Sequence, residues 1–241
     1  MATTLCFDFG NTRKKVAVFN GSNIEKVLVL EDDSNPTIES LIRTYRPKKS
    51  ILSSVTQHNP DILDILGFST RFHLLGHSSK LPITTPVGKP ETIGADRLAL
   101  AAGGVYFYPD RHLLLVGLGT CITLNFVNKF KELIGGSISP GLDMRLRSMH
   151  EFTAQLPYVN PKSDVPLMGY DTETNLLTGV VLGMAFELDG FINEYAERFN
   201  NLGVVLTGGD ARYLSCHLKN DVYVDEDLIF KGLYAISEMN N

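Results

Sequence analysis

The chain has 241 residues, of which 44% are hydrophobic and 20% charged, and its formal net charge is −5. This length is enough to bury a substantial core, in one domain or in two smaller halves. The acidic balance argues against a nucleic-acid binder, which usually presents a basic face, although local patches stay open. The three cysteines have no CxxC spacing, and their odd, sparse count fits reduced thiols in a cytosolic protein better than a disulfide framework.

The first half begins with a predicted three-stranded meander, followed by alternating helices and strands. We expect strands over 5–9, 15–19 and 26–30, a helix over 37–45, a strand over 50–54, a helix over 60–66, a strand over 71–75 and a helix that begins near Gly94. Asn20-Gly21 has the composition of a hairpin turn. Prolines at 82, 86 and 90 indicate a loop before the last of these helices.

The second half repeats this plan. We expect strands over 113–117, 121–126 and 132–138, helices over 142–153 and 172–199, a strand over 203–207, a helix to about 218, a short strand over 222–224 and a helix over 228–237. The repetition predicts an α/β protein with two similar halves, domains 1–110 and 111–241. Each half would be a mixed sheet flanked by helices, a construction that binds ligands beyond the strand ends.

Two strand-to-glycine turns give the first indication of function. Residues 8–12 read Asp-Phe-Gly-Asn-Thr after the first strand, and residues 117–120 read Gly-Leu-Gly-Thr after the first strand of the second half. Glycine lets the backbone approach an anion, and turn amides and hydroxyls supply hydrogen-bond donors. A carboxylate at Asp8 suits the magnesium that accompanies ATP. Taken alone, however, residues 8–12 also fit an ordinary hairpin turn.

Three further segments combine glycine with polar residues. Residues 94–97 read Gly-Ala-Asp-Arg at a helix start, where Asp96 would also stabilise the helix dipole. Residues 135–141 read Gly-Gly-Ser-Ile-Ser-Pro-Gly, which predicts close packing against another element or against a ligand. Residues 206–211 read Leu-Thr-Gly-Gly-Asp-Ala. This turn without bulky side chains could be a flat wall against an adenine ring, or simply the connection from a strand to a helix.

In their order and spacing, these segments together resemble the type III pantothenate kinases. The set is DxGNT, GADR, GTxxT, GGxIxPG with TAQLP at 153–157, and TGGDA, and it covers nearly the whole chain from Asp8 onwards. These kinases belong to the superfamily of acetate and sugar kinases, Hsc70 and actin. The resemblance implies two ribonuclease H-like halves with an ATP cleft between them. It implies ATP-dependent phosphorylation of pantothenate at its primary hydroxyl, the first committed step towards coenzyme A.

The resemblance also assigns roles by position. It implies that Asp96 is the catalytic proton acceptor, that Asp8 lies near the magnesium ion, and that Arg97 anchors the substrate. The implied ATP-binding residues are Asp8, Phe9, Gly10, Asn11, Thr12, Arg13, Lys14, Lys15 and Thr120. The implied pantothenate-binding residues are Gly94, Ala95, Asp96, Arg97 and Thr172. The family also implies a homodimer whose substrate pockets are completed across the interface.

The chain departs from the family pattern at two positions. Gly117 stands where the family usually has an acid that binds potassium or ammonium, so the monovalent cation is left open. Val87 stands where a tyrosine is common, so a hydroxyl donor to the substrate is missing. Two alternatives follow. One is a non-catalytic homologue, like the Bvg accessory factors, which binds nucleotide or pantothenate and acts through a protein partner. The other is a kinase for another small hydroxyl compound.

No membrane segment is expected, because no apolar run approaches the roughly 18 residues that a spanning helix needs. The polar turn at 8–12 comes too early to follow a signal peptide. We therefore expect a cytoplasmic protein with small-molecule partners, without nucleic acid and without a membrane.

Overall fold

The computed structural model describes residues 2–240, which group into two units. One unit holds residues 2–109, 131–133 and 227–240, and the other holds 110–130 and 134–226. Each unit contains a five-stranded sheet. The division into domains 1–110 and 111–241 stays a prediction, and the contacts place the last helix of the chain in the first unit.

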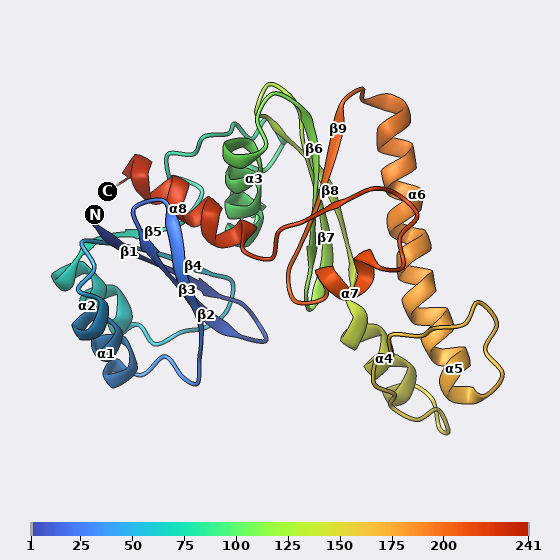
Figure 1. Ribbon diagram of the computed structural model, residues 1–241. Coiled ribbons are helices and arrows are strands. Elements are labelled where there is room, and N and C mark those ends of the chain that lie inside the picture. The colour runs from blue at the N-terminus through green and yellow to red at the C-terminus, as the bar shows by residue number, and fades with distance from the viewer. Residues whose placement is uncertain (1, 241) are drawn as a thin grey trace. The chain divides into compact units, whose positions relative to one another are not determined.

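The first unit has the sheet order β3-β2-β1-β4-β5 (Figure 1). Its strands are β1 (Thr3–Phe9), β2 (Lys14–Asn20), β3 (Asn23–Leu30), β4 (Lys49–Ser54) and β5 (Arg71–Leu74). Strand β1 pairs antiparallel with β2 and parallel with β4, so the meander and the crossover that follows it meet at β1. The strands expected from the sequence are confirmed, with bounds shifted by one to three residues.

Four helices cover this sheet. They are α1 (Asn35–Tyr45), α2 (Asp61–Ser69), α3 (Ala95–Phe107) and α8 (Leu228–Asn240), and a short 3-10 turn at Pro90–Thr92 precedes α3. Phe7 and Phe9 of β1 pack in one core with residues of α1 and α2. Cys6, directly before Phe7, packs in a second core with residues of α3 and α8. Because successive side chains of a strand point to opposite faces, this alternation fixes the face on which every residue of β1 lies.

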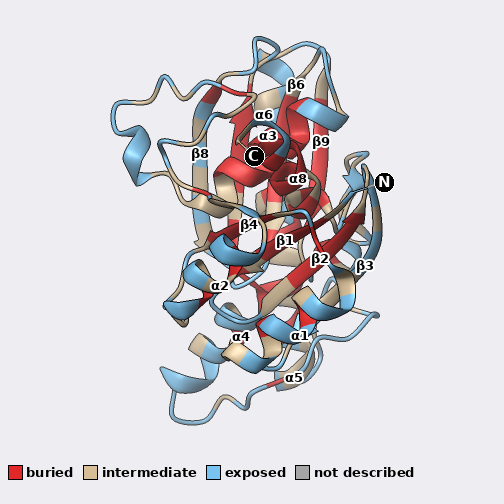
Figure 2. Ribbon diagram, turned by 90° about the vertical axis from the view of Figure 1, so that its left-hand side faces the viewer, coloured by how far each residue is buried: buried red, intermediate tan, exposed pale blue. Residues whose placement is uncertain are grey.

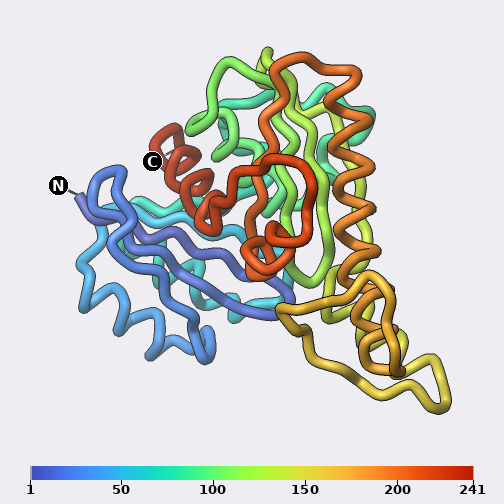
Figure 3. Tube along the Cα trace, turned by 45° about the vertical axis from the view of Figure 1, so that its right-hand side comes forward, coloured from blue at the N-terminus to red at the C-terminus, as the bar shows by residue number. Residues whose placement is uncertain are grey.

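Helices α3 and α8 cross at a pair of glycines. A β-carbon at Gly232 would overlap the carbonyl oxygen of Ala99, and one at Gly103 would lie 2.6 Å from the carbonyl oxygen of Leu228. Only glycine allows the two backbones to come this close. Figure 3 shows the result, with the C-terminal helix lying against the N-terminal strands of the same unit.

The second unit has the sheet order β10-β9-β6-β7-β8. Its strands are β6 (His112–Leu118), β7 (Cys121–Val127), β8 (Leu133–Pro140), β9 (Leu202–Thr207) and β10 (Tyr223–Val224). Its helices are α4 (Leu142–Glu151), α5 (Thr172–Leu177), α6 (Gly183–Arg198) and α7 (Ala211–Ser215). Strand β6 is central, since it pairs antiparallel with β7 and parallel with β9. Figure 2 shows buried residues on the inner strands of the sheets and also along α3 and α8.

The long helix expected over 172–199 is present but contains a π-helical segment. Helix α5 continues through the π-helical residues Thr178–Leu182 into α6. By length and composition alone this helix, Thr172–Arg198, is apolar enough to cross a membrane, and half of its most apolar stretch is buried within the protein. Its buried residues, such as Leu177, Val181 and Leu188, pack in the core of the second unit.

Candidate active site

Asp8 lies at the end of β1, on the face that α3 and α8 cover. The register pairs Asp8 with Lys15 on β2 and with Ser53 on β4. Residues that are directly paired across a sheet have side chains on the same face, so these three form one row across three strands. Cys6, two residues before Asp8, packs against α3 and α8, so the row extends that side of the sheet. The strand ends therefore bring an acid, a base and a hydroxyl together.

The turn that follows Asp8 is tight. The Gly10 amide donates a hydrogen bond to the Arg13 carbonyl over 3.1 Å. The three residues Asn11, Thr12 and Arg13 are exposed at its tip. Phe9 is fully buried on the opposite face of the sheet, so only its backbone can belong to a ligand site. Apart from Asp8 and Lys15, this turn therefore offers mainly backbone and tip side chains to a ligand.

The pKa of Asp8 is raised to about 7, mainly by burial and then by the nearby carboxylate of Asp96, while Lys15 opposes both. Two carboxylates that share a site repel each other when both are charged, so a cation between them would be stabilising. Magnesium binds through one or two carboxylates together with substrate phosphates and several waters. Asp8 and Asp96 fit that donor set. Among residues 2–240, no group of three or more His, Cys, Asp or Glu side chains suits a metal ion.

Asp96 is held at the start of α3. Gly94 is the N-cap residue, and Asp96 lies in the first turn, where a carboxylate favours the positive end of the helix dipole. Ala95 packs against the core between β1 and α8. Arg97 is partly buried: burial lowers the pKa of its guanidinium, and Asp96 raises it. The segment 94–97 thus brings one carboxylate towards Asp8 and places a guanidinium directly after it.

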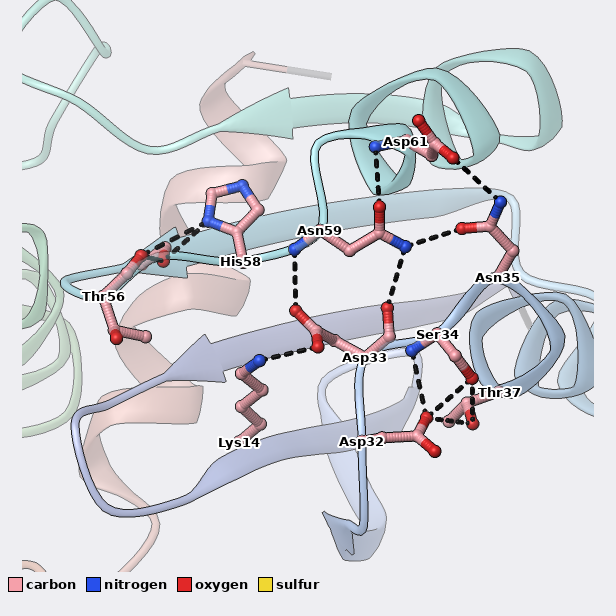
Figure 4. A network of polar contacts seen from close by, with 11 residues as sticks. Lys14, Asp32, Asp33, Ser34, Asn35, Thr37, Thr56, His58, Asn59 and Asp61 are labelled. Atoms are coloured by element: carbon pink, nitrogen blue, oxygen red, sulfur yellow. Dashed lines mark hydrogen bonds and ion pairs between the residues drawn. The ribbon is translucent and has the colours of Figure 1, made fainter.

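Lys14 is not brought to Asp8. Successive residues of β2 alternate between faces, and Lys14 lies on the face of α1 and α2, opposite Lys15. Its ammonium group forms an ion pair with Asp33 over 2.7 Å (Figure 4). The other Asp33 oxygen accepts from the Asn59 backbone amide over 2.8 Å, and the Asn59 side chain bonds to Asn35 over 2.6 Å. This network ties β2 to the loops that precede α1 and α2.

In the second unit, the glycine-rich segments pack against the second turn. The Gly141 amide donates to the Thr120 carbonyl over 3.0 Å, and a β-carbon at Gly141 would overlap that backbone. Gly208 has a φ of +97° and lies against the Leu118 carbonyl. The partner of these two glycines is therefore the backbone of the turn itself. Gly136 is likewise packed against the Leu124 backbone. Thr120 remains exposed at the tip of the turn.

Thr172, the remaining expected substrate residue, belongs to the second unit. It is the first residue of α5, which Asp171 caps by accepting a hydrogen bond from the Thr174 amide over 2.8 Å. Thr172 is exposed and lines a pocket of about 530 Å³. The other lining residues are Met149, Leu156, Asn175, Leu176, Gly179 and Val180. The pocket is mostly apolar, with two polar side chains at α5 and part of the π-helical segment in its wall.

Ser53 is the residue of this site that the sequence did not indicate. It is fully buried, and its Oγ atom has no hydrogen-bond partner in the described part of the chain. Its place beside Asp8 depends on the parallel pairing of β1 with β4, which are separated by three other elements. The available signal was a polar residue near the end of a buried strand.

Comparisons with known proteins show the family of this chain. A family model described as type III pantothenate kinase matches residues 4–194. A type III pantothenate kinase of Christiangramia forsetii is 40% identical over 98% of both chains, and one of Bacteroides fragilis is 35% identical over 98% of both.

Two solved structures show the fold. A Campylobacter jejuni protein described as a Baf family transcriptional activator aligns with a TM-score of 0.66 at 22% identity, covering 98% of both chains. Component A of (R)-2-hydroxyglutaryl-CoA dehydratase from Acidaminococcus fermentans aligns with a TM-score of 0.51 at 12% identity, covering 98% of this chain and 96% of that one. Two mixed sheets, each flanked by helices, are the architecture of the acetate and sugar kinase, Hsc70 and actin superfamily, as expected. This chain belongs to the type III pantothenate kinase family.

Proposed function

We propose that this chain phosphorylates pantothenate with ATP, the first step of coenzyme A biosynthesis. The observation that carries the proposal is the approach of Asp96 to Asp8 in a chain of this family. Phosphoryl transfer depends on positioning and on neutralising charge more than on a strong base. A site that places a basic side chain, a metal-binding carboxylate and a second acid around one strand end meets those needs.

Each residue of the first unit has a separate task in this proposal. The turn at 8–15 holds the phosphates of ATP through its backbone amides and Lys15, and Asp8 holds the magnesium ion. When bound, magnesium neutralises the negative charge of the phosphates. Asp96 accepts the proton of the pantothenate hydroxyl as its oxygen bonds to the γ-phosphorus. The bond from that phosphorus to the bridging oxygen breaks, and ADP leaves with the electron pair.

The substrate is held by the remaining residues. Arg97 suits the carboxylate of pantothenate, because a planar guanidinium binds carboxylates through two parallel hydrogen bonds. The backbone of Gly94 and Ala95 lines the same helix start, and Thr172 contributes from its pocket on α5. Thr120 contacts ATP from the exposed second turn. These roles come from the match of each position to the family pattern.

The wider setting is part of the proposal. A homodimer is supported by large apolar side chains that the second unit leaves exposed, with Phe152 85%, Met168 83% and Tyr170 81% accessible. A cytoplasmic location is supported by three free cysteines. No dependence of turnover on potassium or ammonium is expected, because Gly117 supplies no carboxylate.

The proposed homodimer is tested by size-exclusion chromatography with light scattering, which measures the mass of the protein in solution.

The enzymatic proposal is tested by ADP release in the presence of pantothenate. Wild type should turn over, and Asp96→Asn should lose about a hundredfold or more, the typical contribution of a positioned proton acceptor. If wild type released ADP no faster than Asp96→Asn, the proposed kinase activity would be wrong. Binding of nucleotide or pantothenate without turnover would then favour the non-catalytic homologue. Turnover only with another hydroxyl compound in a substrate panel would change the substrate and keep the chemistry.

A further inference from the structure

Ser53 carries a buried hydroxyl without a hydrogen-bond partner at the strand end that holds Asp8. The residue is 0% exposed, and its Oγ is one of two buried side-chain oxygens or nitrogens without a partner among residues 2–240. Buried polar groups are nearly always hydrogen-bonded, because leaving one unpaired costs roughly 1–3 kcal/mol. An orphaned hydroxyl beside a candidate active site therefore indicates an atom that arrives with a ligand.

The geometry limits what that atom is. Ser53 and Asp8 are paired in register on adjacent parallel strands, which lie about 4.8 Å apart. Both side chains belong to the face that α3 and α8 cover. An ionised carboxylate only accepts hydrogen bonds, whereas a hydroxyl can donate or accept. A group with two protons can therefore satisfy both side chains at once, by donating one hydrogen bond to the Asp8 carboxylate and one to Ser53 Oγ.

We propose that Ser53 is a positioning residue that accepts a hydrogen bond from a water molecule in the shell of the nucleotide-bound magnesium ion at Asp8. A metal-bound water has two protons to donate, and magnesium retains several waters when it binds a protein. This inference rests on the proposed kinase function, since it assigns one more residue to the same site. Partners of this kind orient the groups around a metal ion, and their loss weakens metal affinity.

The same strand supplies a matched control. Ser50 is also fully buried on β4, but it lies on the opposite face, where its hydroxyl pairs with the Thr70 hydroxyl over 2.5 Å. Ser50→Ala removes a satisfied hydrogen bond away from Asp8. Ser53→Ala removes an unsatisfied hydroxyl beside it. The two variants make the same chemical change in the same strand.

The experiment measures two quantities for wild type and both variants. The first is thermal stability of the ligand-free protein in a chelator: Ser53→Ala should be as stable as wild type or more so, and Ser50→Ala less stable. The second is the affinity for ADP by calorimetry, with magnesium and with chelator. Ser53→Ala should lose roughly fivefold to tenfold of its affinity for MgADP, as expected for one hydrogen bond. Without magnesium, Ser53→Ala should bind ADP as tightly as wild type does. Ser50→Ala should match wild type both with magnesium and without it.

Each other outcome overturns the inference. Equal MgADP affinity for Ser53→Ala and wild type would show that Ser53 does not act on the metal. An equal loss with and without magnesium would assign the hydroxyl to a phosphate oxygen. A less stable ligand-free Ser53→Ala with unchanged MgADP affinity would assign it to internal packing. Failure of the kinase proposal is seen separately, as the absence of MgADP binding and pantothenate-dependent ADP release in wild type.

Discussion

The carboxylate of Asp96 lies over the Cα atom of Gly94, so that a β-carbon built at Gly94 would be only 2.5 Å from Asp96 Oδ1. Gly94 has φ −58° and ψ 143°, a conformation open to any residue. Glycine here therefore leaves space for this position of the Asp96 carboxylate and is not required for backbone freedom. The position before the helix leaves room for the carboxylate that we propose as the proton acceptor.

Gly94→Ala should consequently impair catalysis without unfolding the protein. The added methyl group moves the Asp96 carboxylate, and a displacement of about 1 Å at a reacting group costs up to roughly a hundredfold in rate. We expect kcat for ADP release to fall roughly tenfold to a hundredfold, with an unchanged melting temperature. Gly67→Ala is the control, because a β-carbon there, within α2, meets open space. Equal rates for wild type and Gly94→Ala would contradict the placement of Asp96.

Asp8→Asn should make the ligand-free protein more stable above neutral pH. The pKa of Asp8 is raised from 3.8 to about 7, so folding favours its protonated form. Stability from this group is fully present below pH 3.8 and is lost as pH rises through about 7. Since one pKa unit corresponds to about 1.4 kcal/mol, the effect has an upper bound of roughly 4 kcal/mol.

The measurement is urea unfolding of both proteins at pH 5 and pH 8 in the presence of a chelator. Wild type should lose more free energy of unfolding between these pH values than Asp8→Asn does. The exposed Asp64 on α2 provides a surface control, Asp64→Asn. The same pH dependence for wild type and Asp8→Asn would show that the Asp8 carboxylate is not desolvated. In the same variant, magnesium-dependent turnover should fall.

Two neighbouring lysines should behave differently. Lys15→Gln removes the charge beside Asp8, and we expect roughly tenfold weaker MgADP binding, the loss of one charge-assisted hydrogen bond. Lys14→Gln breaks the ion pair with Asp33, and we expect about 1 kcal/mol lower stability with unchanged nucleotide affinity. Calorimetry and thermal unfolding of both variants check this. A larger loss of nucleotide affinity in Lys14→Gln than in Lys15→Gln would show that Lys14, and not Lys15, binds the phosphates.

Turnover should be the same in potassium, ammonium and sodium. Monovalent cations bind to carboxylates and other oxygens, and Gly117 offers no side chain where the family usually has an acid. The measurement is pantothenate-dependent ADP release at constant ionic strength with each cation in turn. A requirement for potassium would mean that other oxygen atoms, such as backbone carbonyls, form the cation site.

The local features of this site were readable from the sequence. Alternating strand residues, the tight turn at 8–12 and the glycine before Asp96 each follow from short-range chemistry. The alternation of Lys14 and Lys15 was also present in the strand pattern, although the family resemblance assigned both lysines to ATP. Each of these features is set by residues within a few positions of one another, so local rules are sufficient.

The features set at long range were not readable. Ser53 reaches Asp8 through the pairing of β1 with β4, and no residue near Ser53 encodes that register. For Gly141 and Gly208, the sequence left open whether a ligand or another element comes close. The partner is the backbone of the 117–120 turn, which lies far from Gly208 along the chain. The π-helical segment within the long helix also has no local signal, since its apolar spacing is that of a continuous helix.

The crossing of α3 and α8 at Gly103 and Gly232 has a consequence for how the protein is made. Helix α3 carries Asp96, yet the helix that packs against it is synthesised only after the ribosome has completed the entire second unit. Until then the nascent first unit exposes apolar residues such as Ala99 and Ala102, which are fully buried in the finished protein. Packing of α8 against α3 is therefore a late event in biosynthesis, because the whole second unit is translated between the two helices.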